Sequence, residues 1–381
     1  MEYFQWFATT ITGLEDLAAK EVEEEAGVTS VPDIGKIFFK GTVEHAVIVN
    51  YSSTMVNRVF LLLAREDVES LEDVYRVAKS LDYSWLIDPN QTFAVRAERH
   101  AKHLSFTSIE ASAKVGRGII DSYREKSGVK LRVNLDEPDL EFYCLLRDSE
   151  MLLGLDTTGL SLHRRYYRVY YHRASLQPTI ASGMIKISGW SDRESLLDPM
   201  CGGATIPIEA AIKLKKIPPG LMRGDLRIGK LKFVDRWVLR DVEEKIKKGS
   251  GIEKVPDVVG VDVSPKSIEG AKKNVEAASV IDIVKLVVAD VFKIGEWLNW
   301  EPDHIVTNPP YGIRMGIRDI ANFYKRLIEN IRRASPKSKL TVIVSKPTLF
   351  KKILDEEGYS IISTREIMYG RLRASIICSE R

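Results

Sequence analysis

The chain has 381 residues, 44% of them apolar, and a formal net charge of +3 at pH 7. We therefore expect two or three domains and a mildly basic surface that permits a nucleic-acid partner without establishing one. It contains no run of roughly 18 apolar residues and no secretory signal at its start, which argues against a membrane span and against secretion. Its three cysteines, Cys144, Cys201 and Cys378, are too dispersed for a disulfide framework or a zinc motif, as expected of a cytoplasmic protein.

The amino-terminal half predicts short strands and helices. We expect strands at residues 4–10, 36–40, 92–99, 131–135, 140–146 and 151–156. We expect helices at residues 13–26, within 43–65, at 71–81 and at 108–126. Strand–helix–strand units of this size fit small α+β domains better than one long parallel sheet.

Two parts of this half resemble domains of RNA-modifying enzymes. The strand at 92–99, the helix at 109–120 with its two glycines, and the segment Asn-Leu-Asp-Glu-Pro-Asp at 134–139 are similar to a THUMP domain. The opening strand and the Gly-Leu-Glu helix resemble the ferredoxin-like domain that precedes THUMP in such enzymes. We therefore expect a ferredoxin-like domain at residues 1–62 and a THUMP domain at residues 63–160.

A basic and aromatic linker is expected at residues 161–180. Its stretch 162–173 interleaves four arginines with four tyrosines and contains no acidic residue. Arginine binds phosphates and tyrosine stacks on bases, so the linker is a candidate RNA contact. The candidate RNA-binding residues are Arg164, Arg165, Arg168 and Arg173. Tyrosines packed between domains would explain the same composition, and the sequence alone leaves both readings open.

Residues 195–211 predict a strand, a glycine-rich turn and a helix. Gly202 and Gly203 let the backbone approach a ligand closely. The helix start near Thr205 offers free N–H groups and a positive dipole end, which suit a carboxylate or a phosphate. The spacing matches neither the dinucleotide fingerprint nor a Walker motif, and packing alone also produces such turns. Cys201 has no neighbouring base, which favours a small turn residue over a nucleophile.

An insertion at residues 213–255 separates this unit from the next strand. It is rich in lysine and arginine and has little regular periodicity. Such charge would suit an RNA backbone near the edge of an active site. For the basic run 245–248, a solvated surface helix at 242–248 is the favoured interpretation.

Two further strands end in acidic residues. The strand at 257–262 ends at Asp262, and the strand at 284–289 is followed by Asp290. An acidic residue at the end of the second strand holds a ribose diol in nucleoside-binding α/β folds. One at the end of the third strand can accept a hydrogen bond from an adenine amine. Asp262 could instead cap the helix at 266–277, although Ser264 could also provide that cap.

Residues 303–307 predict a buried strand that leads into Asn308, Pro309, Pro310 and Tyr311. The prolines fix the backbone and remove two donors, which leaves the Asn308 side-chain oxygen and the Pro309 carbonyl as convergent acceptors. Two such acceptors can hold both hydrogens of a planar exocyclic amine and turn its lone pair toward an electrophile. Tyr311 can stack on the ring that carries the amine. A plain turn at the end of a strand is the alternative.

Together these motifs, over about residues 175–381, resemble the class I S-adenosylmethionine-dependent methyltransferases. The resemblance implies a Rossmann-like α/β domain at residues 181–381, with S-adenosylmethionine as cofactor and no metal. The implied catalytic residues are Asn308, Pro309 and Tyr311. The implied cofactor-binding residues are Asp198, Met200, Cys201, Gly202, Gly203, Ala204, Thr205, Asp262, Val263, Asp290, Val291 and Asn308.

Over its full length the chain resembles archaeal tRNA guanine-N2-methyltransferases that act on position 6 of the acceptor stem. That resemblance implies a monomer that binds the acceptor stem and the 3′ end of tRNA. Bacterial ribosomal RNA guanine-N2-methyltransferases share the architecture, and enzymes that modify tRNA guanosine 10 typically carry Asp at the position of Asn308. Methylation of adenine N6 or of a glutamine amide, or a non-catalytic RNA-binding role, also remain open.

Overall fold

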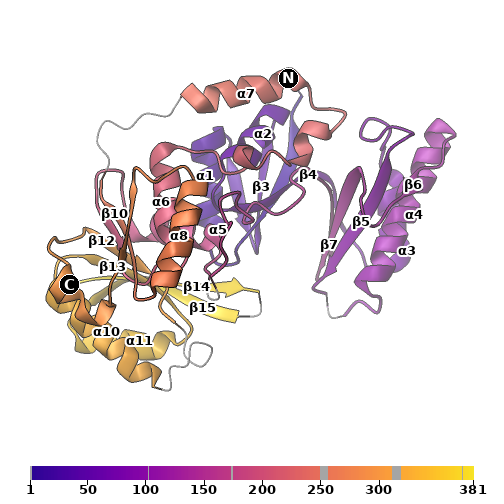
Figure 1. Cartoon of the computed structure of the whole chain (residues 1–381). Coiled ribbons are helices and arrows are strands. Elements are labelled where there is room, and N and C mark those ends of the chain that lie inside the picture. The colour runs from indigo at the N-terminus through magenta and orange to yellow at the C-terminus, as the bar shows by residue number, and fades with distance from the viewer. Residues whose placement is uncertain (1, 102, 173–174, 249–255, 311–318, 371) are drawn as a thin grey trace.

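The computed structural model contains two β-sheets, each with its own helices (Figure 1). It describes residues 2–101, 103–172, 175–248, 256–310, 319–370 and 372–381. Two residues with predicted roles, Arg173 and Tyr311, lie outside the described residues. Within the described part of the chain, no helix is long and apolar enough to span a membrane.

The amino-terminal sheet joins two units through one long strand. Its described strands lie in the order β2-β3-β1-β4-β8-β7-β5-β6. The strands are β1 (Phe4–Thr10), β2 (Ser30–Asp33), β3 (Lys36–Gly41), β4 (Val56–Asp67), β5 (Thr92–Arg99), β6 (Arg132–Val133), β7 (Leu140–Arg147) and β8 (Glu150–Asp156). β4 pairs antiparallel with β1 on one side and with β8 on the other. The two units therefore share one continuous sheet, and β4 crosses the boundary expected at residue 62.

The helices of this half are α1 (Glu15–Ala26), α2 (Val43–Ser52), α3 (Leu71–Ser80) and α4 (Ser108–Ser127). α4 shows how local sequence sets their limits. The Thr107 side chain accepts from the Glu110 N–H, and the Glu110 side chain in turn accepts from the Thr107 N–H, which forms a capping box. Gly128 ends the helix in the left-handed conformation, with φ at 72°.

The prediction of helix as far as residue 65 is wrong for its second part. α2 ends at Ser52, and residues 56–67 form β4. Both faces of β4 are covered at its centre, so Phe60 packs in one apolar cluster while Val59 and Leu61 pack in another. A strand buried on both faces loses its alternating pattern, and such a run cannot be told from a buried helix by periodicity. β6 is also shorter than the predicted strand at 131–135.

The carboxy-terminal sheet has the strand order β11-β10-β9-β12-β13-β15-β14. Its strands are β9 (Leu196–Asp198), β10 (Val258–Asp262), β11 (Val284–Val288), β12 (His304–Thr307), β13 (Lys339–Val344), β14 (Ser360–Tyr369) and β15 (Leu372–Glu380). β15 runs antiparallel to both its neighbours, and the other described pairs are parallel. The order reverses between β9 and β12, which opens a crevice at their carboxyl ends.

Helices cover both faces of this sheet (Figure 1). α5 (Pro178–Ser188), α6 (Thr205–Lys215) and α8 (Pro265–Ala277) pack on one face, and α10 (Ile320–Ala334) and α11 (Pro347–Glu356) pack on the other. Successive strand residues point to opposite faces of the sheet. Leu196 packs in the apolar cluster that contains α5, α6 and α8, and Leu197 packs in the cluster that contains α10 and α11. The remaining helical segments are η1 (Leu221–Arg223), η2 (Arg227–Lys230), α7 (Arg236–Lys248), η3 (Val291–Lys293) and α9 (Ile294–Trp297).

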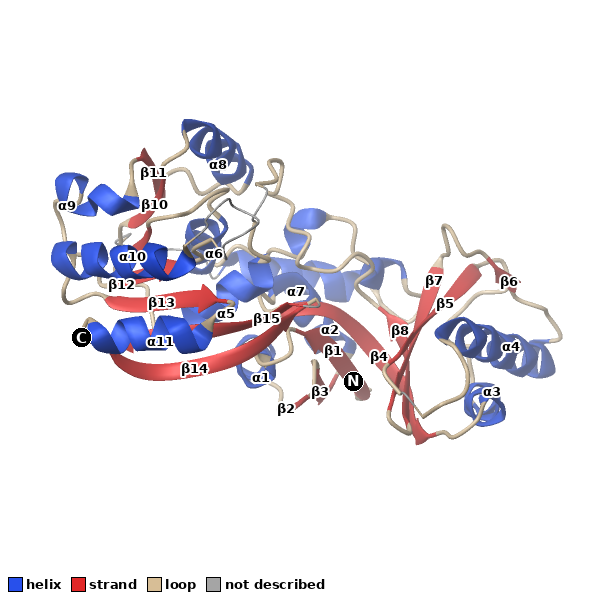
Figure 2. Ribbon diagram, turned by 90° about the horizontal axis from the view of Figure 1, so that it is seen from below, coloured by secondary structure: helices blue, strands red, loops and turns tan. Residues whose placement is uncertain are grey.

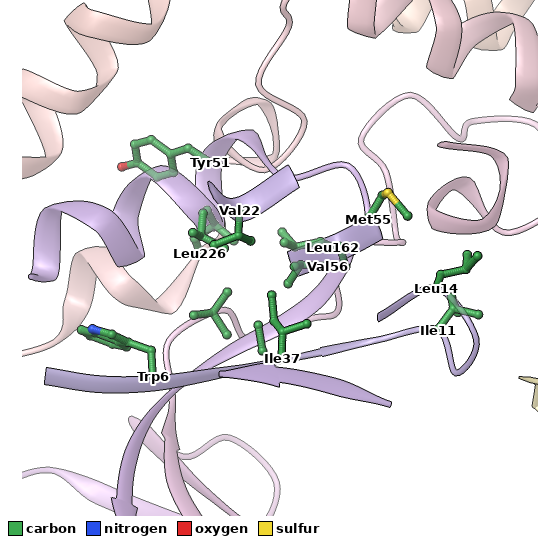
Figure 3. Close-up of a cluster of buried hydrophobic side chains, with 14 of the residues drawn as sticks. Trp6, Ile11, Leu14, Val22, Ile37, Tyr51, Met55, Val56, Leu162 and Leu226 are labelled. Carbon is green, nitrogen blue, oxygen red and sulfur yellow. The ribbon is translucent and has the colours of Figure 1, made fainter. Parts of the chain in front are cut away.

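We call residues 1–62, 63–160 and 181–381 the ferredoxin-like, THUMP and catalytic parts, after the expectations drawn from the sequence. The ferredoxin-like part lies between the other two and shares its core with the catalytic part. Figure 3 shows Trp6 and Ile37 of the first sheet beside Leu162 of the linker and Leu226 of the insertion. In both Figures 1 and 2, α3 and α4 lie at the opposite end of the molecule from α10 and α11. The THUMP part therefore projects away from the catalytic sheet, and it shares one continuous sheet with the ferredoxin-like part.

Candidate active site

The crevice between β9 and β12 brings together segments more than a hundred residues apart. The Thr307 hydroxyl, at the end of β12, donates to Asp198 Oδ1, at the end of β9, over 2.8 Å. The Met200 N–H donates to the same oxygen over 3.2 Å. Asp198 and Thr307 are both buried, so this contact joins the two strand ends beneath the protein surface.

Asp198 carries an altered acidity. Burial raises its pKa to about 7, although the hydrogen bonds from Thr307 and the Met200 N–H lower it, and the Asp262 carboxylate raises it further. Burial of a carboxyl disfavours the charged form. Asp198 therefore changes its protonation near neutral pH, unlike an ordinary aspartate.

The glycine-rich turn follows β9 and is tied to β10. The Cys201 N–H donates to the Val261 carbonyl over 2.7 Å. Gly202 and Ala204 adopt left-handed conformations, with φ at 53° and 62°. A side chain on Gly202 would also meet the His172 ring, because its Cβ would lie 3.1 Å from Nδ1. The turn is thus tight and packed beneath the linker.

Helix α6 begins at Thr205, directly after this turn. Among the described residues, no side chain caps its amino end, and no acidic residue occupies its first turn. Pro207 lies in that turn, as predicted, where its missing N–H costs nothing. Burial and the nearby Asp198 raise the pKa of the Cys201 thiol well above its ordinary value, which favours a turn residue over a nucleophile.

Asp262 lies at the end of β10 and is half-buried. Its Oδ2 accepts from the Gly202 N–H over 3.1 Å, and its Oδ1 accepts from the Ser264 N–H over 2.9 Å. The Ser264 hydroxyl caps α8 by accepting from the Ser267 N–H. Asp262 therefore need not serve as the helix cap, and its carboxylate keeps lone pairs for a further donor. The adjacent Val263 is 65% exposed, an apolar surface beside the acid.

Asp290 follows β11, one strand further along the sheet. Its Oδ1 accepts from the Phe292 N–H over 2.9 Å, and Val291 beside it is buried. The neighbouring order β11-β10-β9-β12 places Asp290, Asp262, Asp198 and Asn308 in one series along the carboxyl edge of the sheet. We call these four residues the strand-end row.

Asn308 closes the strand-end row. Its Oδ1 is buried and has no hydrogen-bond partner among the described residues. A buried acceptor without a partner costs roughly 1–3 kcal/mol, so such an atom is expected where a ligand supplies the donor. Pro309 is buried beside it. Tyr311 lies outside the described residues, so its predicted stacking role stays a prediction.

The prediction that Arg165 contacts RNA is wrong. Its side chain is enclosed, and its Nε and Nη2 donate to the two carboxylate oxygens of Glu209 on α6, each over 3.0 Å. It also donates to the Thr54 carbonyl over 2.7 Å. Burial disfavours its charge, but Glu209 holds the pKa of Arg165 above its ordinary value. The sequence did carry a signal for this contact: Glu209 stands alone in the otherwise apolar start of α6, and a buried acid there requires a basic partner.

Some of the other linker side chains are exposed to solvent, and others pack against the catalytic part. Arg164 is exposed, and the Arg168 guanidinium lies 5.5 Å from the ring centre of Tyr171, which is 74% exposed. The Tyr167 hydroxyl donates to Glu209 over 2.7 Å, and the Tyr166 hydroxyl donates to a backbone carbonyl of the catalytic part. The packing interpretation therefore holds for Tyr166 and Tyr167, and RNA contact by the more exposed side chains stays a prediction.

Asn274 on α8 is a site residue that the sequence gave no signal for. Its Nδ2 donates to the carbonyl of Gly203 over 3.0 Å and to that of Tyr170 over 3.1 Å. Its Oδ1 accepts from the Tyr170 N–H over 2.8 Å. One buried side chain therefore fastens the linker to the glycine-rich turn.

A cavity of about 1300 Å³ lies elsewhere, between α1, α5 and α6. Its lining includes Glu24, Lys186 and Lys213. No member of the strand-end row lines it. The strand ends, and not this cavity, therefore define the candidate site.

Family models match three consecutive parts of the chain. Residues 5–60 match the RlmL ferredoxin-like domain, and residues 68–156 match the THUMP domain. Residues 165–375 match the RMKL-like methyltransferase domain. The order of the three matches is the order predicted from the sequence.

Two curated proteins are similar over nearly the whole chain. The tRNA (guanine(6)-N2)-methyltransferase of Methanocaldococcus jannaschii is 35% identical over 97% of this chain and 98% of that protein. The protein of the same name from Archaeoglobus fulgidus is 35% identical over 98% of this chain and 91% of its own length. A solved structure of SMU.472 complexed with SAH has a TM-score of 0.87 at 21% identity, covering 99% of this chain and 98% of that one. This chain therefore belongs to the THUMP-containing class I methyltransferases, in the family of the archaeal tRNA (guanine(6)-N2)-methyltransferases.

Proposed function

We propose that this chain transfers a methyl group from S-adenosylmethionine to the N2 amine of guanosine 6 in the acceptor stem of tRNA. The observation that carries the chemistry is the buried Oδ1 of Asn308, at the end of the strand-end row, which has no partner within the described part of the chain. The observation that supports the substrate is the near full-length similarity to archaeal enzymes named for that nucleotide.

The residues of the crevice fit S-adenosylmethionine, which supplies an electrophilic methyl group when bound. The uncapped start of α6 offers N–H donors to its carboxylate. Asp262 accepts from the ribose hydroxyls, and the exposed Val263 packs against the flat adenine ring. Asp290 accepts from the adenine amine. Gly202, with φ at 53°, permits the tight turn that leads from β9 into the start of α6.

The chain's own part in the chemistry is to orient the amine. The guanine amine has two N–H groups and a lone pair delocalised into its ring. The Asn308 side-chain oxygen and the Pro309 carbonyl accept from those two N–H groups and turn the lone pair toward the methyl group. No strong base is needed, since the nitrogen becomes acidic on methylation and loses its proton to solvent.

A guanine inside a stem is not accessible to Asn308. Its N2 amine faces the minor groove, but within a base pair cytosine already holds one of the two N–H groups, so Asn308 and Pro309 cannot accept from both. We infer that the base leaves the stack, at a cost of a few kcal/mol. The exposed Arg164 and the half-buried Arg168 of the linker contact the RNA backbone near this point.

The amino-terminal parts supply the position along the RNA. We propose that the ferredoxin-like part, about residues 1–62, and the THUMP part, about 63–160, bind the single-stranded 3′ end of tRNA. The projection of THUMP away from the catalytic sheet supports this division, because two separated contacts can measure a length of RNA (Figure 2).

The test is methylation of defined RNA by the full chain. Purified protein, labelled S-adenosylmethionine and tRNA transcripts are incubated, and the product nucleosides are identified by mass spectrometry. We expect N2-methylguanosine, and we expect it to disappear when guanosine 6 is replaced by adenosine within a maintained base pair. Product in ribosomal RNA but not in tRNA, or N6-methyladenosine in either, would overturn the proposed substrate. The absence of any product would favour a non-catalytic binding role.

A further inference from the structure

The insertion between α6 and β10 crosses the molecule instead of folding onto the catalytic sheet. We call its described residues 217–248 the brace. In Figure 1, α7 lies beside α2 at the edge of the ferredoxin-like part, well away from β10 and β12. The brace therefore leaves the catalytic part and runs across its neighbour.

The first contacts of the brace are with the ferredoxin-like part. The Gly220 N–H donates to the Tyr51 carbonyl over 2.9 Å, and a Cβ at Gly220 would lie 1.9 Å from the Asn50 carbonyl oxygen. Leu226 enters the apolar cluster around Trp6 (Figure 3). Such close approach of backbone to backbone leaves this end of the brace little freedom.

The middle of the brace is fixed where THUMP begins to project. The Ile228 N–H donates to the Thr157 carbonyl, directly after β8, over 2.7 Å. The Arg227 guanidinium lies 3.1 Å from Asp156 Oδ2, and Arg58 of β4 lies 2.7 Å from the same oxygen. The Asp156 carboxylate is fully enclosed, so the two arginines hold it from two different parts of the chain.

The brace then reaches THUMP itself. The Lys232 ammonium lies 2.8 Å from Asp88. Phe233 meets two rings, with its ring centre 5.4 Å from Trp85 of the THUMP part and 6.2 Å from Phe4 of β1. Trp85 and Phe4 stack on each other with centres 5.8 Å apart. Each of the three parts of the molecule supplies one ring to this cluster.

THUMP is attached to the ferredoxin-like part by the pairing of β4 with β8, by the Trp85–Phe4 stack and by a hydrogen bond from Arg147 to the Ile34 carbonyl. The brace adds an attachment that arrives from the catalytic part. A projecting part held at one place can bend about it, whereas a second attachment at a distance resists the bend. The brace is itself an insertion in the catalytic part, so it fixes the position of THUMP relative to the strand-end row.

We propose that the brace determines which nucleotide of the stem reaches Asn308, by fixing the distance and angle between THUMP and the strand-end row. The inference rests on the proposed function, in which THUMP holds one end of the RNA. Neighbouring base pairs stack in direct contact, so a small rotation of THUMP brings a different nucleotide to the pocket. Residues of the brace therefore act as positioning residues, without touching the reacting atoms.

The experiment releases the outer end of the brace. Phe233→Ala removes its ring from the aromatic cluster, and Trp85→Ala removes the ring that it meets. The matched control is Trp237→Ala, which removes a ring that is 58% exposed on α7. Substrates are tRNA transcripts with guanosine at position 6 and at each neighbouring position, in maintained base pairs.

We expect both cluster variants to place about tenfold more product at the neighbouring positions than the parent does, with unchanged affinity for S-adenosylmethionine. The control variant should keep the parent's distribution. An unchanged distribution in both cluster variants would overturn the inference, whether or not their overall rate falls. A parent that makes no product at position 6 would overturn the proposed function instead.

A second measurement needs no RNA. The described native cysteines are all buried, so cysteines introduced by Ile109→Cys on α4 and Lys325→Cys on α10 can be labelled selectively. Distances between the two labels should spread more widely in Phe233→Ala than in the parent or in Trp237→Ala. A distribution as narrow as the parent's would show that the brace does not hold THUMP, which also overturns the inference.

Discussion

Asp198 and Thr307 face each other across two parallel strands, and their hydrogen bond links the glycine-rich turn to the strand that carries Asn308. In the proposed mechanism, the cofactor and the target amine meet at this bond. Its strength depends on the protonation of a carboxyl whose pKa is about 7. We therefore expect the alignment of the site to depend on pH near neutrality.

Asp198→Asn tests that coupling through stability. The folded-state pKa of Asp198, about 7, exceeds its ordinary value of 3.8. At a pH between these two values, the folded protein therefore keeps a proton on Asp198 that the unfolded chain has released. This carboxyl contributes stability at low pH that is lost as the pH rises through about 7. We expect the free energy of unfolding of the parent to fall relative to Asp198→Asn by up to about 1.4 kcal/mol per pH unit between pH 5 and 7. A pH-independent difference, measured by denaturant titration, would contradict this.

Asn308→Ala tests the role of the unpartnered oxygen. The variant loses one of two acceptors that orient the amine, so we expect the methylation rate to fall by roughly 100- to 1000-fold. Affinity for S-adenosylmethionine, measured by calorimetry, should change little. Asn322→Ala on the exposed surface of α10 is the control and should retain the parent's rate. Near-normal turnover by Asn308→Ala would remove Asn308 from the mechanism.

Among the elements, the linker and α6 depend on one enclosed ion pair. Arg165 and Glu209 lie 3.0 Å apart, and the hydroxyls of Tyr167 and Ser182 donate to the same carboxylate. Because α6 begins at the glycine-rich turn, this pair connects the amino-terminal parts to the cofactor site. Loss of one partner leaves a buried charge uncompensated.

Arg165→Met should therefore lower the free energy of unfolding by roughly 3–5 kcal/mol. Adding Glu209→Gln should restore a large part of that loss, because the orphaned charge is removed. Arg164→Gln is the matched comparison, since Arg164 is exposed in the same segment. It should leave the unfolding midpoint unchanged and weaken tRNA binding, with a shallower dependence on salt. A stable Arg165→Met protein with weakened RNA binding would return Arg165 to the RNA surface.

Local patterns predicted β9, β10, β11 and β12 of the catalytic sheet, because these strands and the turn at Gly202 carry their signals within a few residues. No strand was predicted at β13, β14 or β15. Local patterns failed where burial depends on distant partners. β4 looked like a helix because side chains on both of its faces are buried at its centre, and Arg165 looked like a phosphate ligand because Glu209 lies 44 residues away. Asn274 gave no signal, since its partners come from two other segments.

At the scale of the whole molecule, the catalytic part is not an independent body. Gly183 of α5 packs against Leu14, and Asp16 forms an ion pair with Arg365 of β14. A fragment that begins after the linker would expose these surfaces and leave Glu209 without Arg165. The contribution of the amino-terminal parts is therefore better tested by shortening the RNA than by shortening the protein.

A tRNA without its single-stranded 3′ end should be a poor substrate for the full chain. THUMP would lose the nucleotides it is proposed to hold, so we expect the KM to rise by about tenfold or more while the product remains at position 6. The matched substrate is a tRNA shortened by the same number of nucleotides in a distant loop. Equal kinetics for intact and end-shortened tRNA, measured under low-salt and physiological conditions, would contradict the measuring role.

The shared strand β4 also has a consequence for biosynthesis. β4 is complete once Asp67 has been made, and β1 is then available to pair with one of its edges. Its other edge pairs with β8, which ends only at Asp156. Until then an apolar strand keeps an open edge, the kind of surface to which other nascent chains add. Ribosome stalling or early termination before β8 should therefore yield products that aggregate or require chaperones.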